Sequence, residues 1–209
     1  MVSRPTFDDV CAAHDRIRPV VHRTPVMTCA TLDEMAGHRL FFKCEQLQRV
    51  GAFKFRGASN VVLGLTDDEA SRGVCTHSSG NHAQALARAA RERGIPAWIV
   101  MPTSAPAVKR AAVEGYGATI VDCVPTLEAR ESTAAEVLDQ TGALFVHPYD
   151  DDRIIAGQAT AAKELIEDVP DLDVVMAPIG GGGLMSGSCI STAAMLPEAI
   201  LFGAEPEGA

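Results

Sequence analysis

The sequence predicts an α/β protein built on open, parallel, twisted sheets with helices on their faces. Apolar, strand-like runs alternate with helical patterns from residue 73 to the end of the chain. The links between them are short, which favours parallel strands joined by right-handed crossovers. The visible units are too few for a closed eightfold barrel, so open sheets are the better prediction.

The elements can be placed in order along the chain. Thr6 followed by Asp9 predicts a helix start, with Phe7, Val10 and Ile17 on one face. The predicted strands are Leu40–Cys44, Gly73–His77, Ala97–Met101, Ala118–Asp122, Leu144–His147, Val174–Pro178 and Ile200–Ala204. The predicted helices between them are Ala83–Arg93, Ala107–Glu114, Leu127–Gln140, Ile154–Ile166 and Leu184–Met195.

Composition limits the classes of function. The 209 residues are 47% apolar and carry a net charge of −9, which argues against a nucleic-acid or anionic-membrane partner. The six cysteines are widely spaced and form no CxxC pair, as expected of reduced thiols in the cytosol. No signal peptide and no apolar run of roughly 20 residues is present. We therefore expect a soluble, cytoplasmic protein.

The segment Gly51–Ala58 holds a lysine between two aromatic rings, with the sequence Gly-Ala-Phe-Lys-Phe-Arg-Gly-Ala. Burial disfavours an ammonium and lowers its pKa, and a lowered pKa is what a Schiff-base lysine needs. The alternative interpretation is an ordinary lysine at a helix start whose amine reaches solvent. Lys54 is therefore a candidate catalytic residue.

The segment Thr76–Ala85 follows a predicted strand and opens a helix. Ser and Asn fall at its capping positions, and free amides at a helix start can bind a carboxylate. A plain Asn-capped helix is an equally good interpretation of this segment alone.

Four successive glycines, Gly180 to Gly183, follow the predicted strand Val174–Pro178 and open another helix. Such a loop lets several backbone N–H groups surround a phosphate, assisted by the helix dipole. A tight turn needs only one or two glycines, so phosphate binding is favoured. A nicotinamide dinucleotide site is the weaker alternative, because it leaves Lys54 and the Ser-Ser-Gly-Asn-His segment unexplained.

Taken in this order, the three segments resemble the fold-type-II pyridoxal-phosphate enzymes, which are tryptophan-synthase-β-like. The likeness is greatest to serine racemase and the serine/threonine dehydratases. It extends from Phe7 to Glu205 and includes His22–Val26, Phe42–Glu45, Gly115–Ala118 and Ile155–Gln158. It implies two domains with the cofactor between them: residues 48–147 as a small domain, and residues 1–47 with 148–209 as a large domain that is incomplete.

The resemblance also implies a role for each matching residue. Lys54 would carry pyridoxal phosphate and act as a base on one face of the substrate Cα, and Ser79 would face the other side as an acid. The remaining cofactor contacts would be Phe53, Asn81, Gly180, Gly181, Gly182 and Gly183. The substrate contacts would be Ser78, Gly80, Asn81, His82 and Arg130, and Glu205 would be a magnesium ligand.

The implied function is β-elimination of serine or threonine to a 2-oxo acid and ammonia, with racemase activity open because of Ser79. Serine racemase proper, hydroxyaspartate dehydratase and β-replacement of the cysteine-synthase kind are alternatives. Tyr149 departs from the animal racemases, which have asparagine there. The sequence also ends about a third short of the family pattern, so a catalytically inactive chain is the alternative of another class. The full-length form is expected to be a homodimer.

Overall fold

Helices and strands alternate through most of the chain in the computed structural model, which describes residues 4–208. The helices are α1 (Phe7–Ile17), α2 (Ala30–Ala36), α3 (Lys54–Gly64), α4 (Asp67–Arg72), α5 (Asn81–Arg93), α6 (Ala107–Gly115), α7 (Leu127–Thr141), α8 (Asp152–Asp168) and α9 (Gly183–Met195), with 3₁₀ turns η1 (Glu45–Leu47) and η2 (Arg49–Gly51). The strands are β1 (Val26–Met27), β2 (Phe42–Lys43), β3 (Val74–His77), β4 (Ala97–Pro102), β5 (Thr119–Cys123), β6 (Leu144–Phe145), β7 (Val174–Pro178) and β8 (Ile200–Ala204).

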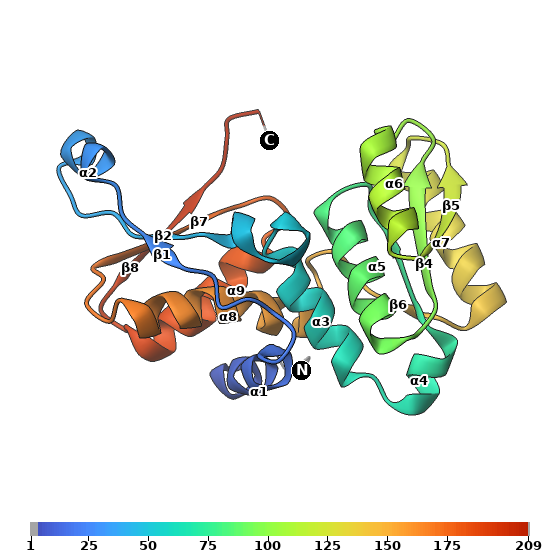
Figure 1. Ribbon diagram of the computed structural model, residues 1–209, viewed down its shortest axis with the longest axis horizontal. Coiled ribbons are helices and arrows are strands. Elements are labelled where there is room, and N and C mark those ends of the chain that lie inside the picture. The colour runs from blue at the N-terminus through green and yellow to red at the C-terminus, as the bar shows by residue number, and fades with distance from the viewer. Residues whose placement is uncertain (1–3, 209) are drawn as a thin grey trace.

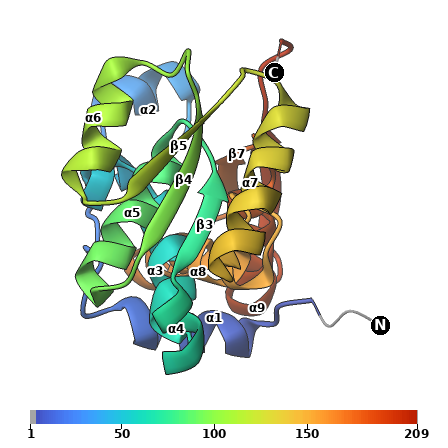
Figure 2. The ribbon, with the colours of Figure 1, turned by 90° about the vertical axis from the view of Figure 1, so that its right-hand side faces the viewer.

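A four-stranded parallel sheet forms one half of the molecule, with strand order β5-β4-β3-β6. Helices α5 and α6 cover one face of this sheet and α7 covers the other (Figure 2). The central strand β4 is apolar on both faces, and Ile99, Val100 and Met101 are fully buried. Burial on both faces explains the near-continuous apolar runs of these strands in the sequence.

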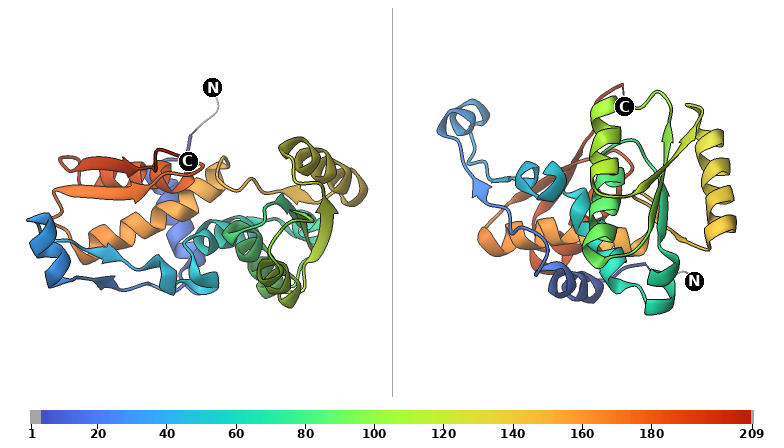
Figure 3. Two further views of the ribbon diagram at one scale, coloured as in Figure 1. Left: turned by 90° about the horizontal axis from the view of Figure 1, so that it is seen from above. Right: turned by 45° about the vertical axis from the view of Figure 1, so that its right-hand side comes forward.

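A second parallel pair, β7 and β8, lies in the other half, beside the short antiparallel pair β1 and β2 (Figure 1). Helices α8 and α9 lie beneath β7 and β8, and the two halves are seen side by side from above (Figure 3). The helices meet closely at Gly187, where an added Cβ would lie 2.7 Å from the Ala159 nitrogen. The opposite face of β7 and β8 is uncovered in the structure of residues 4–208.

Helix α3 lies between the two halves and packs on α8 (Figure 1). The two helices cross where Gly57 faces Gly157, and a Cβ on Gly157 would lie 2.6 Å from the Gly57 Cα. Only glycine permits so close an approach of two backbones. The first turn of α3, which begins at Lys54, is thereby held against α8.

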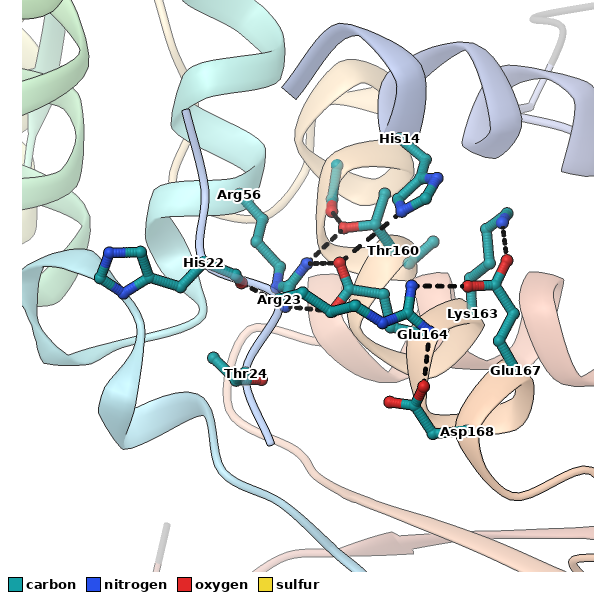
Figure 4. Close-up of polar contacts among 12 residues, drawn as sticks. His14, His22, Arg23, Thr24, Arg56, Thr160, Lys163, Glu164, Glu167 and Asp168 are labelled. Atoms are coloured by element: carbon teal, nitrogen blue, oxygen red, sulfur yellow. Dashed lines mark hydrogen bonds and ion pairs between the residues drawn. The ribbon is translucent and has the colours of Figure 1, made fainter. Parts of the chain in front are cut away.

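A buried ion network fixes the same first turn (Figure 4). Arg56 is fully buried and donates from Nη2 to Glu164 on α8, and from Nε to Glu45, both at 2.8 Å. Lys43 on β2 and His14 on α1 reach Glu164 as well, at 2.8 and 3.7 Å. One carboxylate therefore ties together α1, β2, α3 and α8.

The prediction of an α/β fold with open parallel sheets is confirmed, and the predicted helix start at Thr6 is a capping box with Asp9. Helices α2, α3 and α4 were absent from the prediction. Across residues 4–208, no helix is long and apolar enough to cross a bilayer. The six cysteines all carry free thiols.

Candidate functional site

Lys54 opens α3 and is held at its amine by one backbone oxygen. Its Nζ donates to the Pro148 carbonyl at 2.7 Å and lies 5.3 Å from the centre of the Phe53 ring. Burial lowers the pKa of the Lys54 ammonium below its ordinary value, as the sequence predicts. A lowered pKa gives the amine more of its neutral, nucleophilic form near neutral pH.

The segment Ser78–His82 joins β3 to α5, but its capping differs from the prediction. The N-cap is Gly80, no side chain caps the helix, and Asn81 is the exposed first helical residue. Ser78 instead accepts the Gly80 N–H at 3.3 Å. Capping by Ser or Asn is therefore wrong, and the first-turn N–H groups of α5 are left for another acceptor.

The His82 ring lies in the interior rather than at this helix start. It is 2% exposed, and its Nε2 lies 3.3 Å from the Val146 carbonyl. Burial, with a smaller contribution from the charge of Lys54, lowers the pKa of His82 to about 3. The ring is neutral at physiological pH, so only the backbone N–H of His82 is suited to bind a carboxylate.

The four glycines form the connection from β7 to α9. Gly182 is the N-cap of α9 with φ +86°, a left-handed conformation that favours glycine, and no side chain caps this helix. A Cβ on Gly180 or Gly182 would meet no heavy atom within 4 Å among the described residues. One side of the loop is thus open, with helix-start amides beside it.

The turn His147–Asp150 brings Lys54 and the glycines together. Pro148 accepts from Lys54, and the next side chain, Tyr149, lies against Gly181. A Cβ on Gly181 would lie 2.1 Å from the Tyr149 ring, so only glycine fits beneath it. The sequence prediction missed this turn as a site element, because a backbone carbonyl partner leaves no residue-type signal.

The other predicted site residues lie apart from this contact. Arg130 is on α7, and its buried Nε has no hydrogen-bond partner within residues 4–208. Ser79 is half-buried in the loop before α5. Glu205 follows β8 and is exposed, and the described part of the chain contains no group of three metal-ligating side chains.

A hollow of about 590 Å³ lies between the β1–β2 arm and α8 with β7. Of the predicted cofactor residues it includes only Phe53, and its lining is mostly apolar, with Phe42, Leu165 and Met176 among its members. It borders the start of α9 through Leu184, but the loop glycines Gly180 to Gly183 are not in its lining.

The chemistry of the donor set fits a phosphorylated aldehyde cofactor. The lysine supplies a half-buried amine of lowered pKa, and the glycine loop supplies backbone donors on its open side. Both contact one four-residue turn. This arrangement, on an α/β fold, is suited to a cofactor held by a lysine.

Comparison with known proteins agrees with that class. Residues 17–209 match the family described as pyridoxal-phosphate dependent enzyme. The chain is 54% identical over 205 residues to β-hydroxyaspartate dehydratase of Paracoccus denitrificans, covering 98% of this chain and 65% of that protein. It therefore spans just under two thirds of that relative's length.

Two solved structures have the same fold. Serine racemase from Dictyostelium discoideum superposes with a TM-score of 0.96 at 48% identity, covering 99% of this chain and 67% of that one. Maize serine racemase gives a TM-score of 0.97 at 47% identity, covering 99% and 63%. The chain belongs to the pyridoxal-phosphate dependent enzyme family, in its fold-type-II branch.

Proposed function

We propose that this chain carries the cofactor lysine of a pyridoxal-phosphate-dependent lyase for a small hydroxy amino acid, with Lys54 as that lysine. The observation that carries the proposal is the contact of one turn with both the Lys54 amine and the glycine loop. The division into a small domain of residues 48–147 and a large domain of residues 1–47 with 148–209 is part of the proposal. It is supported by the separation of the four-stranded sheet from β7 and β8.

Different segments of this chain are proposed to bind the cofactor phosphate and the substrate carboxylate. The amides of the loop Gly180–Gly183 would hold the phosphate of the cofactor, aided by the dipole of α9. The free first-turn amides of α5, with Ser78 and Asn81 beside them, hold the substrate carboxylate. When bound, the cofactor withdraws electrons from the substrate Cα and so acidifies its proton.

Lys54 then moves that proton as a general base. An amine whose pKa is lowered by burial is better matched to proton transfer near neutral pH than an ordinary lysine. Loss of the β-hydroxyl completes the elimination. The half-buried Ser79 in the loop before α5 is the proposed acid of a racemase side activity, and Phe53, beside the Lys54 amine, would help to hold the cofactor.

The specific substrate within this class is proposed as serine or threonine, with 3-hydroxyaspartate as a second candidate. The second candidate is favoured by the unpaired, buried Nε of Arg130, because a dicarboxylic substrate brings an extra carboxylate for a guanidinium. The similarity to β-hydroxyaspartate dehydratase of Paracoccus denitrificans supports the same choice. Magnesium at Glu205 and a cytoplasmic homodimer stay predictions.

The test is a visible absorption spectrum of the 209-residue chain with pyridoxal phosphate, before and after L-serine, L-threonine or 3-hydroxyaspartate. The proposal predicts a visible band that shifts with one of these substrates, release of the matching 2-oxo acid, and loss of the band in Lys54→Ala. Lys109→Ala is the matched control, because Lys109 is exposed on α6. A band that survives Lys54→Ala, or no band at all, would contradict the proposal. Chiral analysis for D-serine separates the racemase from the lyase.

A further inference from the structure

The amine of Lys54 has a single polar partner within residues 4–208, the carbonyl of Pro148. A lysine side chain has a flexible stem of four methylene groups. Fixing the backbone of the first turn of α3 therefore does not by itself orient the Lys54 amine. The 2.7 Å bond to Pro148 is therefore what orients Nζ in this structure. Whatever fixes the Pro148 carbonyl also fixes the direction of the amine.

The side chain of His147 fixes that carbonyl. Its Nδ1 accepts the N–H of Asp150 at 2.8 Å and the N–H of Tyr149 at 3.3 Å, on the far side of Pro148. A ring nitrogen that accepts hydrogen bonds carries no proton, so the hydrogen of the neutral ring is on Nε2. The two bonds close the chain into a tight turn around Pro148.

Ring contacts hold His147 itself. It meets Tyr149 edge to face with 4.6 Å between ring centres, and Phe145 and His77 edge to face at 6.2 and 6.3 Å. Tyr149 in turn lies on Gly181, and its backbone oxygen would be 2.9 Å from a Cβ on Gly183. The same ring stack therefore continues to the glycine loop.

We infer that His147 is a positioning residue, whose Nδ1 holds the Pro148 carbonyl where it aims the Lys54 amine. The inference rests on the proposed function in taking Lys54 as the cofactor lysine. His147 does not contact the amine and acts through Pro148. The asparagine side chain can replace it, because its Oδ1 stands where Nδ1 does and accepts backbone N–H groups in an Asx-turn.

The test compares His147→Asn with His147→Ala in the 209-residue chain. Binding of pyridoxal phosphate is measured by equilibrium dialysis, in the wild-type and the Lys54→Ala background. His147→Ala is expected to weaken binding about tenfold, as the loss of two hydrogen bonds implies, and His147→Asn less than about threefold. In the Lys54→Ala background the effect of His147→Ala should fall below about threefold, because the residue it positions is absent.

A second readout needs no cofactor. Acylation by a succinimidyl ester is followed by mass spectrometry at Lys54 relative to exposed Lys109. His147→Ala should accelerate labelling of Lys54 at least about threefold by releasing its amine from Pro148, whereas His147→Asn should not. If the wild-type chain binds no pyridoxal phosphate, the proposed function fails while this readout still decides the role of His147.

Three results would overturn the inference. The first is a Lys54 labelling rate in His147→Ala equal to that of the wild type. The second is an equal loss of pyridoxal-phosphate affinity in His147→Asn and His147→Ala. The third is a loss of affinity caused by His147→Ala that is undiminished in the Lys54→Ala background. If His147→Ala does not fold, His147→Gln replaces it, because its amide reaches the position of Nε2 and leaves that of Nδ1 empty. The same expectations then apply to His147→Gln.

Discussion

The four-stranded sheet and the β7–β8 pair are both parallel, yet they are covered differently. Strand β4 is buried on both faces, with Ile99 fully enclosed. In the β7–β8 pair, the partners Val174 and Ile200 are 41% and 58% exposed, and the partners Met176 and Phe202 are 65% and 50% exposed. The apolar side chains on one face of this pair thus remain in contact with solvent.

The difference shows that the four-stranded sheet is covered on both faces by residues 4–208, whereas β7–β8 is covered on one face. Parallel sheets are almost always covered on both faces, and a contiguous exposed apolar patch is a surface for another polypeptide. The glycine loop leaves from the end of β7, so the phosphate half of the candidate site is on the less supported pair, while Lys54 is anchored by α8 and the ion network.

Removing Arg56 should have the largest effect on stability. Arg56→Met leaves the carboxylates of Glu45 and Glu164 without their guanidinium partner, and breaking a buried ion pair costs about 3–5 kcal/mol. Urea unfolding measures the free energy of unfolding. The matched control is Arg39→Met, because the Arg39–Asp171 pair is exposed and should change it by less than about 1 kcal/mol. Equal effects would contradict the anchoring role of the network.

Two isoleucines compare the sheets directly. Ile99→Ala in β4 should cost about 2–5 kcal/mol of unfolding free energy, because it leaves a cavity in a closed core. Ile200→Ala in β8 should cost less than about 1 kcal/mol, because its side chain is already largely hydrated. Urea denaturation of both variants decides the matter. A large cost at Ile200 would mean that the face of β7–β8 is covered in solution.

Buried His82 on α5 should make the stability of the chain fall between pH 7 and pH 5. The pKa of His82 is about 3 when folded and about 6.5 when unfolded, so below pH 6.5 the unfolded chain takes up a proton that the folded chain excludes. Stability falls as pH falls, by about 2 kcal/mol between pH 7 and pH 5. His82→Gln should remove this part of the slope in urea titrations at each pH. An unchanged slope would show that the ring is accessible to protons.

Glu164 acts in a lower pH range. Burial alone would raise its pKa, but hydrogen bonds from His14 and Arg56 outweigh burial and hold the pKa well below its ordinary value. Its contribution is present above the unfolded pKa of about 4.5 and is lost as pH falls further.

A charge on the uncovered face should have the smallest effect on stability. Met176→Lys is expected to change the free energy of unfolding by less than about 0.5 kcal/mol, because the side chain is mostly exposed. Urea unfolding measures this change, and Met35→Lys on α2 is the matched control, because Met35 is also mostly exposed. A loss of several kcal/mol would contradict the exposure of this face.

The sequence predicts the elements that carry regular apolar patterns. The bounds of β7 and β8 are those observed, since each is an apolar run between turn residues. The sequence does not predict helix α3, because Gly57 interrupts its apolar pattern. Gly57 permits the close contact with Gly157, a hundred residues away in the sequence. No local pattern contains that information.

The candidate site also contains some features that the sequence predicts and others that it does not. Lys54 could be chosen from its neighbours, and the four glycines from their placement after a strand. The capping of α5 was wrong because Ser78 turns back to Gly80 rather than to the helix. The turn at His147 was missed because its partners are backbone atoms, although a histidine just before a proline and a tyrosine is a visible feature.

Lys54 is proposed to be the residue that takes the cofactor, and chemical trapping of the bound lysine tests this assignment. The chain has four lysines, Lys43, Lys54, Lys109 and Lys163. Incubation with pyridoxal phosphate at equal concentration, reduction with borohydride and peptide mass spectrometry show which of them is modified. Modification of Lys54 alone is expected. Modification of another lysine in its place, or of exposed Lys109 in equal measure, would contradict it.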